Sequence, residues 1–375
     1  MSSTNSTDAA GELSRADVQA LLNDFDSLDP ITPQEAVDQY ISSRKSDLTS
    51  STLEDYEDSL DYVVKYCEKE GIDNLNDFGG RQIFDYTEWR KHESSNKVHK
   101  LAKKTMRDEL YTLSAFLRFL EKIDAVERGT AEKVDPPTLE SGEGVRDVEL
   151  EIDFLQDVTD YLTKYHYASR EHVVISIIEE TGRRLGGVHS LDLCDTHLDG
   201  SNPFLEFRHH GDGNSRLKNG EKSEQQVNIS KQLADLIRDY LKNQRIDKEV
   251  DGRKPLLTTS HGRLAKGTIR TYFYKWTRAC KVGKTCPENR NPENCNAACS
   301  KDAASKCPTS EAPHAAKHGY LTEMRRREVP KEVLSERCDV SEEIIEEVYD
   351  ERSVEEKRDY RREVLEDALG KEGDL

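Results

Sequence analysis

Apolar side chains recur at intervals of three and four residues through the first third of the chain. Such spacing places one apolar stripe on a helix. It predicts four helices, which begin at Pro33, at Ser51 or Thr52, at Gln82 and at Lys103. Thr32 suits an N-cap, and proline is well placed in a first turn. The pattern therefore predicts a small all-α domain over residues 31–125.

The pattern breaks on both sides of this domain. Residues 1–30 are rich in Ser, Thr and Asp, which predicts a flexible tail. Residues 129–144 are rich in Pro, Gly and Glu and lack any apolar period. That composition is typical of a linker, which we place at residues 126–147.

The second half mixes helical periods with short β-like segments. Helices are predicted near residues 151–164, 171–180, 231–243, 268–278, 315–326, 331–337 and 341–349. Two β-like pieces, at 204–208 and 226–229, flank a turn rich in Gly, Lys and Asn. We expect a mainly α fold with a small β-sheet: an all-α N-terminal domain, then an α+β domain over residues 148–352. A charged helical tail follows at 353–375.

Charge and hydropathy restrict the class of protein. The 375 residues include 55 Lys and Arg against 74 Asp and Glu, a net charge of −19, and only 34% are hydrophobic. This composition argues against a membrane protein, and no secretory signal is visible, so we expect a cytoplasmic location. The acidic excess could disfavour polyanionic partners. Because acidic residues are spread along the whole chain, we favour adaptation to a high-salt cytosol, as in a halophilic archaeon or its virus.

Five of the eight cysteines lie within residues 280–307, inside an irregular insertion over residues 280–312. Cys286, Cys295, Cys299 and Cys307 are spaced Cys-x8-Cys-x3-Cys-x7-Cys. The insertion has few apolar residues to bury, so a four-thiolate structural zinc site would order it. The alternative is a set of reduced cysteines on a flexible loop. Disulfides are disfavoured in a cytosol.

Three motifs in the second half follow a specific order. The first is Thr181-Gly-Arg-Arg-Leu-Gly-Gly-Val-His-Ser-Leu-Asp-Leu, and the second is a Lys-bearing turn after Arg216. The third is Pro313-His-Ala-Ala-Lys-His-Gly-Tyr-Leu-Thr, followed by a helix that ends at Tyr349. In this order the motifs resemble the tyrosine recombinases, the phage-integrase family. The resemblance covers about residues 33–350.

The resemblance implies a set of catalytic residues. These are Arg184, Lys218 (with Lys222 as second choice), His314, Lys317 and Tyr349 as the nucleophile. It implies cutting and rejoining of double-stranded DNA through a 3′-phosphotyrosyl intermediate, without metal or ATP, by a homo-tetramer on paired sites. It also implies a SAM-like DNA-binding fold for the N-terminal domain. Two departures stand out, because Lys317 replaces an arginine and Cys338 replaces a His or Trp.

Basic residues that could contact DNA occur in both domains. They are Arg44, Lys45, Lys97, Lys100, Lys103, Lys104, Arg270 and Lys275. Each could equally belong to a solvated helix face.

Two other functions compete with the recombinase hypothesis. A catalytically impaired relative that only binds DNA sequence-specifically would tolerate Lys317 and Cys338. A metal-dependent nuclease is disfavoured, because no Asp/Glu cluster accompanies the motifs.

Overall fold

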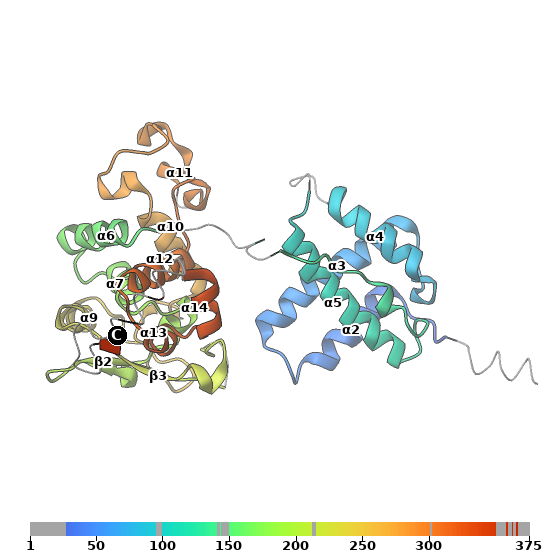
Figure 1. Ribbon diagram of the computed structural model, residues 1–375, viewed down its shortest axis with the longest axis horizontal. Coiled ribbons are helices and arrows are strands. Elements are labelled where there is room, and N and C mark those ends of the chain that lie inside the picture. The colour runs from blue at the N-terminus through green and yellow to red at the C-terminus, as the bar shows by residue number, and fades with distance from the viewer. Residues whose placement is uncertain are drawn as a thin grey trace, which may run out of the picture. The chain divides into compact units, whose positions relative to one another are not determined.

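The structure is a computed structural model that describes residues 28–94, 100–140, 143, 150–211, 215–300, 302–349, 358, 362, 365 and 366. Side chains of residues 347–349 lie outside this description. The chain forms two compact units, Met1–Arg146 and Asp147–Leu375 (Figure 1), and each is described by itself. Among the described residues, no helix combines the length and apolar character needed to cross a membrane.

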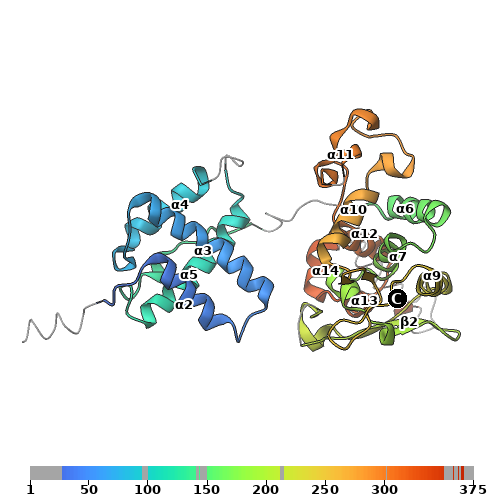
Figure 2. The same cartoon turned by 180° about the vertical axis from the view of Figure 1, so that it is seen from behind.

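The first unit is the predicted helical domain. It contains α2 (Pro33–Arg44), α3 (Ser50–Glu70), α4 (Gly80–His92) and α5 (Lys103–Lys122). A short 3-10 turn at Leu75–Asp77 connects α3 to α4, and another at Ala131–Lys133 follows α5. Helices α2, α3 and α5 pack against one another, and α4 packs on α3 (Figures 1 and 2). The apolar stripes face inward, so residues such as Tyr40, Leu60 and Leu113 are buried.

Helix boundaries in this unit follow local chemistry. The Thr32 hydroxyl accepts the backbone N–H of Glu35, while the Glu35 carboxylate accepts the N–H of Thr32, which caps α2. Gly71 ends α3 with φ +69°, a conformation that glycine adopts without steric cost.

The expected linker begins too early at residue 126. Val126, Ala131 and Val134 are buried in the core of the first unit. The Asn76 side chain also donates to the Ala125 carbonyl at 2.7 Å, and the Ala131 N–H donates to Glu121 at 2.7 Å. These few apolar residues have no helical period, so composition alone concealed their packing.

The second unit is α+β. Its helices are α6 (Ile152–Tyr165), α7 (Arg170–Thr181), α8 (Leu185–Ser190), α9 (Lys231–Asn243), α10 (Lys266–Trp276), α11 (Asn296–Cys299), α12 (Pro313–Arg326), α13 (Lys331–Cys338) and α14 (Glu342–Tyr349). Helix α7 is central and packs against α6, α9, α10 and α12. Its residues from His172 to Ile178 are buried, which explains why α7 is apolar nearly all round.

Two small antiparallel sheets complete this unit. One has the order β1 (Thr196–His197), β2 (Phe204–Phe207), β3 (Gln225–Asn228), with Leu205 opposite Val227. The other pairs β4 (Thr258–Thr259) with β5 (Gly262–Arg263). The predicted mainly α fold with a small sheet is confirmed; the short elements β1, β4, β5 and α11 were not predicted.

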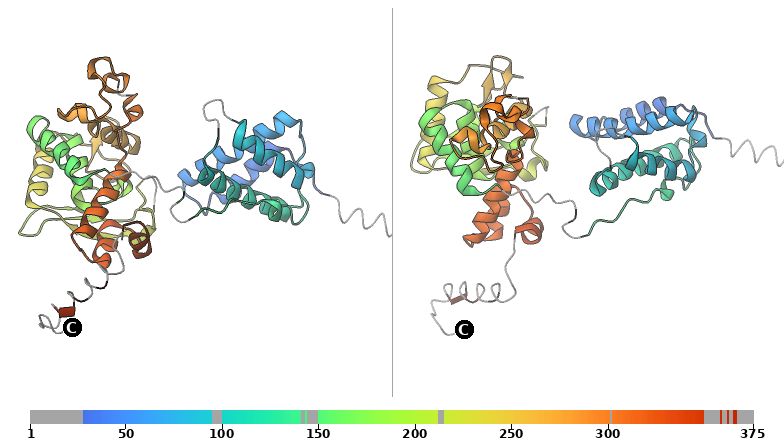
Figure 3. Two further views of the ribbon diagram at one scale, coloured as in Figure 1. Left: turned by 45° about the horizontal axis from the view of Figure 1, so that its top comes forward. Right: turned by 90° about the horizontal axis from the view of Figure 1, so that it is seen from above.

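The Cys-rich insertion forms a lobe beside α10 (Figure 3, left). Small side chains order it, since Ala297, Ala303 and Ala304 are buried. The buried Arg278 guanidinium donates to the Ala297 carbonyl. Thr277 Oγ1 donates to the Glu311 carbonyl and accepts the Glu311 N–H at 2.8 Å. The few small apolar residues of this segment, together with these hydrogen bonds, therefore pack it against α10.

Candidate active site

Arg184 lies at the junction of α7 and α8. Gly182 ends α7 with φ +61°, and a Cβ there would lie 2.5 Å from the Tyr320 ring and 2.9 Å from Cys338 Sγ. Glycine is thus required for this turn to pack against α12 and α13. Arg184 follows as the N-cap of α8, with 24% of its side chain exposed.

The partner of Arg184 is an aspartate that sequence reasoning missed. Asp339 ends α13 with φ +53°, and its Oδ2 accepts a hydrogen bond from Arg184 Nη1 at 2.6 Å. Its Oδ1 accepts from Ser223 Oγ at 2.7 Å and from Asn219 Nδ2 at 3.3 Å. This carboxylate, 14% exposed, ties the arginine to the turn after Lys218.

Helix α12 brings His314 and Lys317 to the same region. Pro313 opens the helix, and Lys317 is 2% exposed. The Lys317 ammonium donates to the backbone carbonyls of Cys338 and Asp339, the latter at 3.2 Å. It therefore contacts the residue that also binds Arg184. Burial, followed by the positive charge of Arg184, lowers the pKa of Lys317 to about 7.

His314 and His318 form a contact pair one helical turn apart. Their Nε2 atoms are 2.9 Å apart, and the rings meet edge to face with centroids 4.4 Å apart. Although His314 reaches the surface, desolvation of its ring lowers its pKa to about 4, assisted by His318 and the charges of Lys317, Arg184 and Lys218. His314 is thus neutral at pH 7, and a neutral imidazole can accept a proton.

Lys218 and Tyr349 are the remaining two residues of the predicted set, and the structure describes the side chain of Lys218 but not that of Tyr349. Lys218 is exposed in the turn before Gly220–Ser223, and its charge is one of those that lower the pKa of His314. Lys222 is exposed within that short 3-10 turn. Tyr349 is the last residue of α14, which packs on α12 and α13 through the buried Ile345. Its side chain lies outside the described residues.

A second arginine lies beneath this cluster. Arg183 is buried, stacks over the Phe207 ring at 4.5 Å and donates to the Ser223 carbonyl at 3.2 Å. Its sequence neighbour Arg184 is the one that reaches the surface. Cys338 is also buried, and burial raises the pKa of its thiol to about 11. It packs rather than reacts.

The predicted DNA-contacting residues differ in their surroundings. Lys45, Lys100, Lys104 and Arg270 are exposed. Arg44 lies 3.8 Å from Asp47, and Lys103 forms a 2.6 Å ion pair with Glu143. Lys275 is bound to Glu171 at 2.8 Å and lies over the Trp276 ring, so a structural role already occupies its charge. Lys97 lies outside the described residues.

The four-cysteine zinc prediction is not supported. Cys299 Sγ is near the carbonyls of Pro292 and Glu293, and Cys307 Sγ is 3.3 Å from Thr309 Oγ1. Within the described part of the chain, only Asp192, Cys194 and Asp195 place three ligand-type atoms within 4.8 Å of one another.

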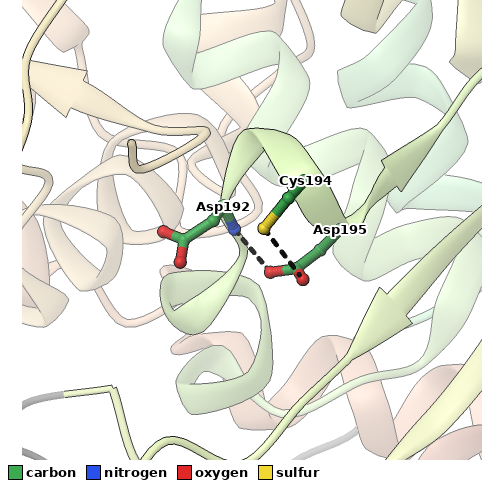
Figure 4. Close-up of side chains that lie close together, drawn as sticks. All are labelled: Asp192, Cys194 and Asp195. Carbon is green, nitrogen blue, oxygen red and sulfur yellow. Dashed lines mark hydrogen bonds between the residues drawn. The ribbon is translucent and has the colours of Figure 1, made fainter. Parts of the chain in front are cut away.

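This Asp–Cys–Asp group is a structural turn (Figure 4). Asp195 accepts the backbone N–H of Asp192 at 2.8 Å, and the Cys194 thiol donates to Asp195. Asp192 instead binds Arg253 and Arg263, at 2.5 and 2.6 Å. Its oxygens are therefore neutralised by arginines, which leaves a poor donor set for a cation.

Comparison with known proteins places the fold. No protein-family model and no curated protein matches the sequence. The Tn1549 transposon integrase, solved in complex with transposon right end DNA, matches with a TM-score of 0.60 at 13% identity, over 89% of this chain and 100% of that one. A lambda integrase dimer bound to a COC′ core site matches with a TM-score of 0.57 at 12% identity, over 90% of this chain and 81% of that one. The fold is therefore that of the tyrosine recombinases.

Proposed function

We propose that this protein is a tyrosine-type site-specific DNA recombinase or integrase. The observation that carries the proposal is that Arg184 meets His314 and Lys317, which lie together in a distant part of the sequence, in one cationic cluster. The fold shared with integrases that were solved on DNA supports it. The substrate is double-stranded DNA at specific sites, and the assembly is a homo-tetramer on two paired sites.

The reaction needs charge stabilisation and two proton transfers. The Tyr349 hydroxyl oxygen attacks a backbone phosphorus, a 3′-phosphotyrosyl bond forms, and the bond to the 5′-oxygen breaks. Neutral His314 would donate to a non-bridging oxygen or help to remove the tyrosine proton, and exposed Lys218 donates a proton to the leaving 5′-oxygen. Arg184 and cationic Lys317 stabilise the non-bridging oxygens. Attack by a new 5′-hydroxyl reverses these steps, so neither metal nor ATP is required.

The Arg184–Asp339 pair sets the resting state of this site. A carboxylate holds the Arg184 donor in the way a phosphate oxygen would. A DNA phosphate must therefore displace Asp339 or share the guanidinium with it. The pair therefore lowers the affinity for DNA by competition.

Lys317 gives the site a pH dependence that an arginine would not. With its pKa lowered to about 7, Lys317 loses its charge as pH rises through neutrality, unlike a guanidinium. Cleavage should fall above pH 7 for this reason, except where a bound phosphate restores the cationic form.

The acidic composition bears on the working conditions. A net charge of −19 repels DNA at long range, and salt screens this repulsion, so that local basic residues can bind the DNA backbone. We therefore retain the proposal of a high-salt cytosol. In the first unit, exposed Lys45, Lys100 and Lys104 are proposed to contact the DNA backbone.

One observation favours a second candidate function, DNA binding without cleavage. The Lys317 ammonium is directed at backbone carbonyls, and Asp339 occupies Arg184. A protein retained only for binding would tolerate both features. Formation of a covalent adduct separates the two functions.

The experiment uses suicide DNA substrates that trap a phosphotyrosyl adduct. Wild type should form the adduct, and Tyr349→Phe should abolish it while leaving the DNA mobility shift nearly intact. Tyr165→Phe is the matched control, because Tyr165 is exposed in the same unit. This variant should cleave DNA at the normal rate. Adduct formation by Tyr349→Phe would exclude the assigned nucleophile, and a shift without any wild-type adduct would favour the binding protein.

A further inference from the structure

A second cationic pocket lies at the C-terminal end of α8. It is a pocket of about 410 Å³ lined by His189, Arg253, His261, Arg263 and Lys266, with Asp251 at its exposed edge. None of these residues belongs to the Arg184–His314 cluster. Arg184 caps the start of α8 and His189 lies in its last turn, five residues later, a rise of about 7.5 Å along the helix.

The arginines form the fixed wall of the pocket. The Arg263 guanidinium donates to the carbonyls of His189, Ser190 and Leu191 at 2.9–3.2 Å and to Asp192 at 2.6 Å. Arg253 also binds Asp192, and it donates to Ser215 Oγ at 2.5 Å. Asp192 is 2% exposed, so it sits behind the arginines and does not reach the pocket opening.

The N-terminus of α10 lies at the same pocket, because Ala265 and Lys266 line it. Ala265 is its N-cap and supplies no side-chain hydrogen bond. Within the described residues, no acceptor contacts the backbone N–H groups of Lys266 and Gly267. These unpaired N–H groups carry the positive end of the helix dipole, and the exposed Lys266 ammonium adds to it.

His189 provides an independent sign of a ligand site. Its side chain is only 6% exposed and lines the pocket, and Nδ1 is buried without a hydrogen-bond partner in the described structure. A buried polar atom without a partner costs free energy unless something binds it. Burial, followed by the charges of Lys266, Arg263 and Arg253, lowers the pKa of His189 to about 4, so its ring is neutral and carries one N–H.

We propose that this pocket is a phosphate-binding subsite that holds one non-reacting phosphate group. Three cations against Asp192 and Asp251 leave it net positive, and the lysine, the imidazole and the helix N-terminus supply the donors. The ligand is either a backbone phosphate of the DNA cut at Arg184 or free inorganic phosphate. The DNA alternative rests on the proposed function. The short distance along α8 would let one duplex engage both sites.

The first experiment titrates inorganic phosphate into the full chain by calorimetry. An Arg184→Gln background removes phosphate binding at the proposed active site. Lys266→Gln should weaken binding about tenfold, as expected for one lost charge-assisted hydrogen bond. Lys242→Gln makes the same charge change at an exposed position of α9. It is the control and should have no effect on phosphate binding.

A second variant separates binding from folding. Ala265→Asp puts a carboxylate at the N-cap, where it accepts the free N–H groups of α10 and repels an anion. Its Tm should stay equal or rise while phosphate binding is lost. Unchanged phosphate binding in a folded Ala265→Asp protein would overturn the free-phosphate alternative.

The second experiment tests the DNA alternative. The logarithm of DNA affinity is plotted against the logarithm of salt concentration for a non-specific duplex. Lys266→Gln should reduce the slope by about 0.9, the value for one lost phosphate contact, and Lys242→Gln should not. A changed slope identifies DNA as the source, and phosphate binding with an unchanged slope identifies the free anion.

If neither phosphate affinity nor salt slope responds to Lys266→Gln, the subsite does not exist. Both readouts precede chemistry, so they remain valid if the protein forms no covalent adduct. Failure of the proposed function and failure of the subsite are therefore distinguishable.

Discussion

The two ends of α8 carry the same kind of ion pair with opposite consequences. At the start, Asp339, whose side chain is 14% exposed, binds Arg184, the residue proposed to hold a substrate phosphate. At the end, Asp192 binds Arg253 and Arg263 from behind, and the pocket in front stays open. An aspartate behind an arginine orients it, whereas an aspartate in front competes with the ligand. Asp192 is fully enclosed whereas Asp339 is partly exposed, and we expect this difference in burial to separate the two roles.

The largest effect, on the free energy of unfolding, should come from removing Asp192, which lies behind Arg253 and Arg263. Asp192→Ala leaves two partly buried arginines without a counter-charge, and breaking a buried pair costs about 3–5 kcal/mol. Chemical denaturation should show this loss in the free energy of unfolding. Asp199→Ala is a control, because Asp199 is fully exposed 3.7 Å from Arg238. A loss below about 1 kcal/mol would break the comparison, because such a value is typical of a surface pair.

The next largest effect should be on chemistry at Arg184. Arg184→Gln removes one positioned cationic donor, and a loss of about 10²- to 10³-fold in cleavage rate is expected. Single-turnover adduct formation measures it. Because Asp339 keeps its hydrogen bonds to Ser223 and Asn219, stability should change little. A variant that cleaves at the wild-type rate would remove Arg184 from the active site.

The ammonium of Lys317 is a buried cation whose partners are backbone carbonyls instead of a carboxylate. Its folded pKa of about 7 lies below the unfolded value of 10.5, so between these pH values the unfolded chain binds more protons. The free energy of unfolding should therefore rise with pH across pH 7–10.5, by on the order of a few kcal/mol. The Lys317→Met variant should lack this rise. Parallel pH profiles for the two proteins would show that the ammonium is not desolvated.

A further variant at this position sharpens the chemical consequence. Lys317→Arg keeps the positive charge at every pH near neutrality. Its cleavage rate should lose the decline above pH 7 expected for wild type. The measurement is adduct formation from pH 6 to 9, and a decline that persists in Lys317→Arg would assign it to another group.

The smallest effect, on DNA affinity, should come from substituting Asp339, the partner of Arg184. Asp339→Asn removes the competing charge but keeps a side chain that tolerates φ near +53° and can still bond Ser223. DNA affinity should rise about tenfold or less, as expected for one exposed ion pair released. Fluorescence anisotropy measures it. Weaker binding would mean that Asp339 orients Arg184 as Asp192 orients its arginines.

Much of the fold could be predicted from local sequence. The stripe in α5 and the caps around Thr32 depend on residues within one or two turns, so their period and chemistry are legible in the chain. Arg184, His314, Lys317 and Tyr349 were assigned from short motifs that resemble a known family, and their catalytic roles stay predictions. The packing of Val126 and Val134 was not legible, because isolated apolar residues between turns carry no period.

The sequence by itself determined the helices, the two-part layout and the residue types that bear on phosphate chemistry, because these follow from short-range spacing. Tertiary structure decided what each charge faces. Arg184 and Asp339 are 155 positions apart, and His189 meets Lys266 only because α8 packs on α10. Burial changes the pKa of Lys317 and assigns opposite roles to two similar aspartates, and burial depends on contacts that no local pattern encodes.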